Sequence, residues 1–97
     1  MNTQDITQFL ASRKAEMTQQ FGVVKIGLFG SYARGEADEN SDIDLAIEMA
    51  PDRKNLHNFM AFKRYLEAAF DKKVDIGIES SLKPEARKLI EKEIFYV

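Results

Sequence analysis

Hydrophobic and polar residues alternate along the chain with two different periods, which predict where helices and strands lie. Apolar residues recur at helical spacing over about residues 3–20 and 55–70, predicting two long amphipathic helices. We expect both stripes, including their methionine and aromatic residues, to pack in the core and not to form a cofactor pocket. The stripes consist of Ile6, Phe9, Leu10, Met17 and Phe21, and of Leu56, Phe59, Met60, Leu66 and Phe70.

Three shorter segments carry the pattern of β-strands. Residues 23–29 form a compact β-branched and aromatic run, while residues 43–47 and 74–78 alternate apolar and polar positions with period two. A short helix is expected to open at Ser31, and Pro84 suits the first turn of a last helix. The predicted buried stripe of that last helix is Ala86, Leu89, Ile90, Ile94 and Val97. Strands separated by helices favour an α/β fold, with a small three-stranded sheet packed on helices.

Length and composition narrow the class of protein. With 97 residues, 44% hydrophobic and 31% charged, the sequence predicts a single globular domain over residues 1–97. It has no apolar run long enough to cross a membrane and no signal-peptide pattern, so a cytoplasmic location is expected. Because there is no cysteine, disulfides and thiolate metal ligands are excluded. A net charge of −2 argues against broad nucleic-acid binding.

Three aspartates stand at polar positions of the strand-like segments. Asp42 and Asp44 lie one residue apart where the chain turns apolar, and Asp75 lies between Val74 and Ile76. Because successive side chains of a strand alternate faces, all three carboxylates would emerge on the face away from the helices if their strands are neighbours. Two carboxylates about 7 Å apart repel by roughly 2 kcal/mol at an effective dielectric near 20. The cluster therefore indicates a hard cation, Mg²⁺ or Mn²⁺, which prefers oxygen ligands.

A Gly-Ser turn supplies a second element of the predicted site. Gly30 closes the first strand, and ten residues separate Ser31 from Asp42. Glycine lets the backbone approach a phosphate closely, while Ser31 can offer a hydroxyl and cap the short helix, whose first amides favour an anion. Arg34 could reach the same phosphates or pair with an acidic neighbour. Each feature alone is common, but together with three strand aspartates they are typical of metal-dependent nucleotidyl transfer.

Other polar residues are interpreted as surface. Glu36, Asp38 and Glu39 belong to an acidic run that we expect to be a solvated loop. His57 is the only histidine, and with no cysteine or second histidine a zinc site is not favoured.

The stretch from Leu28 to Ala37 (LFGSYARGEA), followed by residues 41–45 (SDIDL), closely resembles the signature of the polymerase β-like nucleotidyltransferase superfamily. The small size and the ending IFYV resemble the minimal nucleotidyltransferase (MNT) branch. The resemblance spans nearly the whole chain. It implies the polymerase β-like nucleotidyltransferase fold, an α/β (α+β) arrangement with a small three-stranded mixed sheet packed on helices.

The resemblance also implies roles for the residues singled out above. Gly30 and Ser31 would contact the triphosphate of ATP, and Arg34 matches the arginine that usually follows the Gly-Ser turn. Asp42, Asp44 and Asp75 would bind the metal ions, and Asp75 could also assist deprotonation of the attacking hydroxyl. The implied chemistry is an in-line attack on the α-phosphate with release of pyrophosphate.

Minimal members resemble the antitoxin of HEPN/MNT toxin–antitoxin modules, which implies transfer of AMP to a tyrosine of a helical HEPN ribonuclease toxin. Two alternatives remain open at this point. One is a non-catalytic module that neutralises a toxin by covering it, with Phe95 and Tyr96 in the contact surface. The other is nucleotidyl transfer to a small molecule, such as an aminoglycoside.

Overall fold

The computed structural model describes residues 1–97 and contains an ordered alternation of helices and strands. An asparagine caps the N-terminus of each long helix: Asn2 accepts a hydrogen bond from the Asp5 amide, and Asn55 accepts one from the Asn58 amide. Pro84 occupies the first turn of the last helix, as the sequence predicts. The elements, with η for 3₁₀ turns, are α1 (Thr3–Phe21), β1 (Val23–Phe29), α2 (Ser31–Arg34), β2 (Ile43–Met49), η1 (Pro51–Arg53), α3 (Leu56–Phe70), β3 (Val74–Ile78), η2 (Glu79–Ser81), α4 (Pro84–Glu91) and β4 (Phe95–Tyr96).

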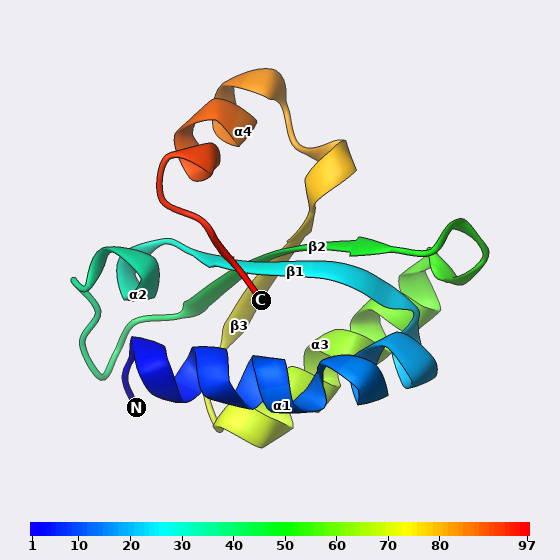
Figure 1. The fold of residues 1–97 in the computed structure, drawn as a ribbon, viewed down its shortest axis with the longest axis horizontal. Coiled ribbons are helices and arrows are strands. Elements are labelled where there is room, and N and C mark those ends of the chain that lie inside the picture. The colour runs from blue at the N-terminus through cyan, green and yellow to red at the C-terminus, as the bar shows by residue number, and fades with distance from the viewer.

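The strands form one mixed sheet in the order β3-β2-β1-β4. Strand β1 pairs antiparallel with both β2 and β4, whereas β2 pairs parallel with β3. Figure 1 shows α1 and α3 side by side below the sheet and α4 above it. The sheet therefore has a helix-covered face, which meets α1 and α3, and an α4 face on the other side.

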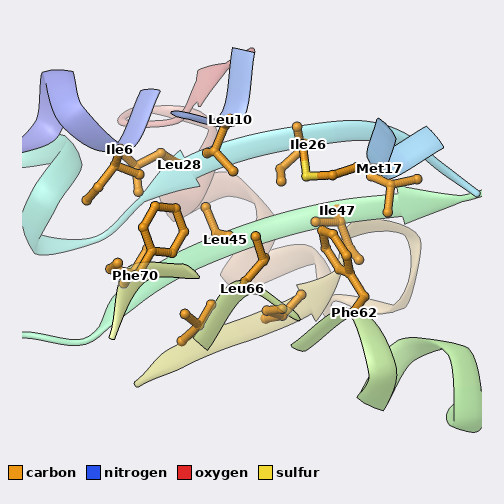
Figure 2. Packing of buried hydrophobic residues seen from close by; sticks show 14 of the residues in the cluster. Ile6, Leu10, Met17, Ile26, Leu28, Leu45, Ile47, Phe62, Leu66 and Phe70 are labelled. Atoms are coloured by element: carbon orange, nitrogen blue, oxygen red, sulfur yellow. The ribbon is translucent and has the colours of Figure 1, made fainter. Parts of the chain in front are cut away.

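The core lies between the sheet and the helix pair. Figure 2 shows side chains of α1 and α3 converging on those of β1 and β2. Burying each large apolar side chain contributes on the order of 1.5–3 kcal/mol. The labelled core residues are Ile6, Leu10, Met17, Ile26, Leu28, Leu45, Ile47, Phe62, Leu66 and Phe70.

The buried stripe of α3 differs from the one that the sequence suggested. Phe62, which is not in the predicted stripe, is fully buried, whereas Met60 lies at the surface and Leu56 is 75% exposed. A helix turns about 100° per residue, so Met60 lies roughly 120° around the axis from the buried Leu66. Phe59 is partly buried against the core. The core stripe therefore follows Phe62, Leu66 and Phe70, and Leu56 and Met60 were wrongly assigned to it.

The C-terminal segment also differs from the prediction. It adds a fourth strand to a sheet for which three strands were predicted. Helix α4 ends at Glu91, and Phe95 and Tyr96 pair with Leu28 and Gly27 at the free edge of β1. The amide of Val97 continues this pairing by donating to the Ile26 carbonyl at 3.0 Å. These bonds satisfy backbone groups that a longer helix would have left unpaired on the edge strand.

As a result, the apolar residues predicted to form the buried face of the last helix do not form one. Leu89 is 66% exposed, and no residue of α4 is fully buried. Ile94 lies after the helix and packs over Gly27, where a methyl group would come within 2.6 Å of the isoleucine side chain. Gly27 is opposite Ala46, and Ala46 is opposite Gly77. This row of small residues lets the chain segments around α4 approach the sheet closely.

Glu48 anchors one end of the α4 face. Its carboxylate accepts hydrogen bonds from the Lys54 ammonium at 2.5 Å and from the Ser80 amide at 3.2 Å. Burial alone would raise the pKa of Glu48, but the hydrogen bonds from Lys54, Ser80 and the Met49 amide lower this pKa to about 2. The ionised carboxylate therefore stabilises the contact between β2, η1 and η2.

We expect Glu48→Gln to lower the free energy of unfolding at pH 7 by about 1 kcal/mol, allowing for solvent screening of a partly exposed pair. Because the pKa is lowered in the folded state, the stabilisation is complete above the ordinary value of 4.5 and disappears as pH falls through about 2. Urea unfolding at pH 7 and at pH 2 measures both effects. Glu85→Gln, at an exposed site on α4, serves as the control. A difference between wild type and Glu48→Gln that persists unchanged at pH 2 would contradict the electrostatic origin.

No helix in the structure combines the length and the apolar character needed to cross a membrane.

Candidate active site

Two of the predicted site residues lie side by side on neighbouring strands. Asp44 of β2 is in register with Asp75 of β3, and both alternate with residues buried on the helix-covered face. Their side chains therefore belong to the α4 face of the sheet. Asp42 directly precedes β2 and is half-buried. The pairing of β2 with β3, which the sequence alone does not establish, brings two carboxylates together from distant parts of the chain.

The carboxyl group of Asp44 lies in an environment that disfavours its charge. Burial is the main cause that raises the pKa of Asp44, and the negative charges of Asp75 and Asp42 raise it further. Arg34 opposes this increase, whereas Glu93 adds to it. Several carboxylates therefore share one electrostatic site, in which a cation would remove the mutual repulsion.

The Gly30 turn packs directly against Asp44. Phe29 is the register partner of Asp44, and the next residue, Gly30, has φ 78° and ψ −156°. This combination is accessible essentially only to glycine. A methyl group at Gly30 would collide with the Asp44 carboxylate, so the missing side chain is what lets the turn and the aspartate touch. The turn and the carboxylate pair thus form one continuous surface.

Ser31 and Arg34 are carried by the short helix α2. Gly30 and not Ser31 is the N-cap residue, and no side chain caps the helix, so the expectation that Ser31 caps it is wrong. The hydroxyl of Thr3 at the start of α1 donates to the Tyr32 carbonyl, and Tyr32 is buried. These contacts fix α2 on the main body of the protein and direct the turn towards the strand aspartates.

Arg34 is paired with acidic neighbours, one of the two outcomes that the sequence left open. Its guanidinium contacts Glu36 at 3.0 Å and Glu93 at 3.0 Å. Glu93 also accepts a hydrogen bond from the Gly30 amide at 2.5 Å. Glu93 carries no signal in the sequence, because the helical spacing around it predicts a position inside the last helix, where nothing distinguishes it from other surface glutamates. Its place in the site depends on the return of β4 to the edge of β1.

The donor atoms at the site suit a hard cation. Asp42, Asp44 and Asp75 offer only oxygen, the chain has no cysteine, and its single histidine lies at the start of α3, so the donors do not favour zinc. No group of three or more metal-ligating side chains is already close enough to hold an ion by itself. Mg²⁺ is commonly held by one or two carboxylates together with water and substrate phosphate, which agrees with an incomplete set of protein ligands. The residues present therefore fit such an ion.

The site is an open surface and not an enclosed pocket. Cavities of about 340 and 500 Å³ lie beside the start of α3 and between α1 and β4, and neither is lined by the three aspartates. His57 is exposed at the start of α3, as expected for a surface histidine. The aspartates lie near one end of the sheet, where Asp42 and Asp44 are half-buried and Asp75 is exposed.

Comparison with known proteins identifies the family to which this chain belongs. The nucleotidyltransferase domain family matches residues 11–97. The protein adenylyltransferase MntA of Thermococcus cleftensis is 38% identical over 97 residues, covering 100% of this chain and 97% of the relative. A solved structure with the provisional name of minimal nucleotidyltransferase superposes with a TM-score of 0.82 at 30% identity, covering 98% of this chain and 95% of the other.

A crystal structure named as a toxin–antitoxin with AMP-PNP is also similar. Its TM-score is 0.70 at 25% identity, and the match covers 99% of this chain and 72% of the other. The fold is that of a minimal nucleotidyltransferase. The chain belongs to the nucleotidyltransferase domain family, and its similarities lie with the minimal nucleotidyltransferases and MntA proteins.

Proposed function

We propose that this chain transfers an AMP unit from ATP to a hydroxyl group of a partner protein. The observation that carries the proposal is the direct packing of the Gly30 turn against Asp44, which is opposite Asp75. In this arrangement a triphosphate bound at the turn would lie beside the carboxylates. The similarity to a relative named protein adenylyltransferase supports protein as the acceptor class.

Each site residue has a proposed role. The Gly30 amide, the Ser31 hydroxyl and the Arg34 guanidinium bind phosphate oxygens of ATP. Asp42, Asp44 and Asp75 hold Mg²⁺, or Mn²⁺, which when bound neutralises charge on the reacting phosphate. Asp75, at the exposed end of the pair, also accepts the proton of the acceptor hydroxyl. The hydroxyl oxygen forms a bond to the α-phosphorus, and the bond to the β-phosphate breaks to release pyrophosphate.

The proposed acceptor is a tyrosine of a helical HEPN-type toxin, which makes the chain an antitoxin acting in the cytoplasm. The similarity to a toxin–antitoxin crystal structure that contains AMP-PNP supports both the partner class and the nucleotide. A non-catalytic antitoxin is the second candidate. It is favoured by the exposure of Leu89, Phe95 and Tyr96 on one C-terminal segment, which could cover a partner without chemistry.

The test is the intact mass of the proposed acceptor, a helical HEPN-type toxin, after incubation with the chain, ATP and Mg²⁺. We expect the acceptor to gain the mass of one or more AMP units, and no gain when Asp44→Asn replaces the wild type. The Asp52→Asn variant, which removes an equal charge from exposed η1, should leave the gain unchanged. A stable complex with no added mass would support the non-catalytic candidate. Added mass on an aminoglycoside instead of the protein would favour small-molecule transfer.

A further inference from the structure

Glu93 extends from the C-terminal segment into the proposed nucleotide site. It lies between α4 and β4, and its amide donates to the Ile90 carbonyl at 3.0 Å. On the other side Ile94 packs on Gly27, and the strand that follows pairs with β1. The backbone of Glu93 is therefore held on both sides, so its side chain has a defined place above the sheet.

The Glu93 carboxylate occupies donors that a phosphate would use. One of its oxygens accepts from the Gly30 amide at 2.5 Å, and the Arg34 guanidinium donates to the two oxygens at 3.3 and 3.0 Å. A carboxylate and a phosphate are both anions that accept charge-assisted hydrogen bonds from amides and guanidinium groups. The Gly30 amide has a single hydrogen and lies part-buried in this contact, so Glu93 and a phosphate oxygen compete for it directly.

We propose that Glu93 is an internal competitor of the nucleotide, which holds the Gly30 amide and Arg34 in the free protein and leaves them when the triphosphate binds. This inference rests on the proposed function, because it uses the site residues assigned there. A rotation of the Glu93 side chain is enough to vacate both donors, since the backbone on either side stays anchored. Only molecules in which Glu93 has left the Gly30 amide and Arg34 can bind the nucleotide, so the apparent affinity falls in proportion to their fraction.

The negative charge of Glu93 is also expected to weaken nucleotide binding. The carboxylate lies near Asp44 as well as Arg34, so it adds negative charge to a surface that must accept a polyanion. Repulsion alone would weaken nucleotide binding without any competition for hydrogen bonds. A substitution that keeps the charge but shortens the side chain separates the two effects.

The first experiment is calorimetric titration of ATP with Mg²⁺ into wild type, Glu93→Ala, Glu93→Asp and the control Glu91→Ala. Glu91 is exposed two positions earlier, so its removal changes the net charge equally. We expect Glu93→Ala to bind ATP roughly tenfold more tightly, as for the loss of one charged hydrogen-bond contact. Glu93→Asp should also bind more tightly, because it lacks one methylene and cannot reach the Gly30 amide. Glu91→Ala should match the wild type.

Several results would overturn the inference. Equal or weaker binding by Glu93→Ala would make Glu93 a support for Arg34. Wild-type affinity of Glu93→Asp beside tighter binding of Glu93→Ala would leave repulsion as the only effect. Absence of ATP binding in every protein would also overturn it, since nothing would then compete. The proposed function can fail separately from this inference. In that case the calorimetric affinity changes would still be seen, but no acceptor protein would gain the mass of AMP.

A second measurement does not depend on affinity. In ¹⁵N spectra of the nucleotide-free protein, we expect the Gly30 amide resonance to shift in Glu93→Ala and Glu93→Asp but not in Glu91→Ala. Saturating ATP should shift the Gly30 and Glu93 resonances of the wild type together. A Gly30 resonance that is identical in wild type and Glu93→Ala would show that the contact does not form in solution.

Discussion

Replacing Asp44 by Asn is expected to lower the rate of AMP transfer by about 10³-fold or more. A metal ion at the reacting phosphate supplies several kcal/mol of transition-state stabilisation, and each 1.36 kcal/mol corresponds to a tenfold change in rate. Asp44 is the central carboxylate of the proposed site, because it is opposite Asp75 and touches the Gly30 turn. The initial rate of acceptor modification at saturating ATP measures the loss. A variant with more than a tenth of the wild-type rate would contradict this role.

The same substitution is expected to stabilise the metal-free protein, raising its melting temperature by a few degrees. Burial and the neighbouring Asp75 and Asp42 raise the pKa of Asp44, so its ionised form destabilises the fold at neutral pH. The favourable neutral form is fully present below the ordinary pKa of 3.8 and is lost as pH rises through the raised value. Asparagine stays neutral at every pH. For a domain of this size 1 kcal/mol corresponds to about 4–8 °C.

Thermal melts with a chelator, at pH 7 and at pH 3, measure this effect. The variant should exceed the wild type at pH 7, and the difference should shrink at pH 3. Adding Mg²⁺ should raise the melting temperature of the wild type but not of the variant, because a ligand that binds the folded state stabilises it. A lower melting temperature of Asp44→Asn in chelator would show that the carboxylate supports the fold instead of straining it.

The sequence predicted the central fold because its signals there were local and consistent. Alternation around Asp44 and around Asp75 identified both strands and the faces of their side chains, and Gly30 marked the turn. The register that sets Asp44 opposite Asp75 could not be read from either strand alone, since it depends on pairing between segments about thirty residues apart. The roles of these residues in catalysis stay predictions.

The C-terminal part was harder to predict because two kinds of structure compete there. Leu89, Ile90 and Ile94 have helical spacing, yet a short strand at Phe95 and Tyr96 satisfies the exposed edge of β1. That edge is a property of the folded sheet and has no local signature in the last residues. Glu93 became part of the site through the same event, so the error about the helix and the missed residue have one cause.

Replacing Gly30 by Ala is expected to lower the free energy of unfolding by about 3 kcal/mol and the melting temperature by roughly 10–20 °C. The backbone at Gly30 has φ 78° and ψ −156°, a conformation that costs a residue with a side chain on the order of 1–3 kcal/mol. In addition, the new methyl group would collide with the Asp44 carboxylate. Relief of that collision must displace the carboxylate, so transfer should fall by about a hundredfold in protein that is still folded.

Gly35→Ala is the control for a glycine at positive φ without a collision. Because its αL backbone costs a side chain less than the backbone of Gly30, the transfer rate and not the stability isolates the effect of the collision. Gly35 also has a positive φ, 73°, but nothing lies within 4 Å of a methyl group there. This substitution should cost only about 1 kcal/mol, the ordinary price of a left-handed residue with a side chain. Chemical unfolding and transfer rates measured below the melting temperature test both variants. Equal losses of transfer rate in the two variants would mean that the collision with Asp44 does not matter. We expect a larger loss of transfer rate in Gly30→Ala, because only there does the methyl group displace the Asp44 carboxylate.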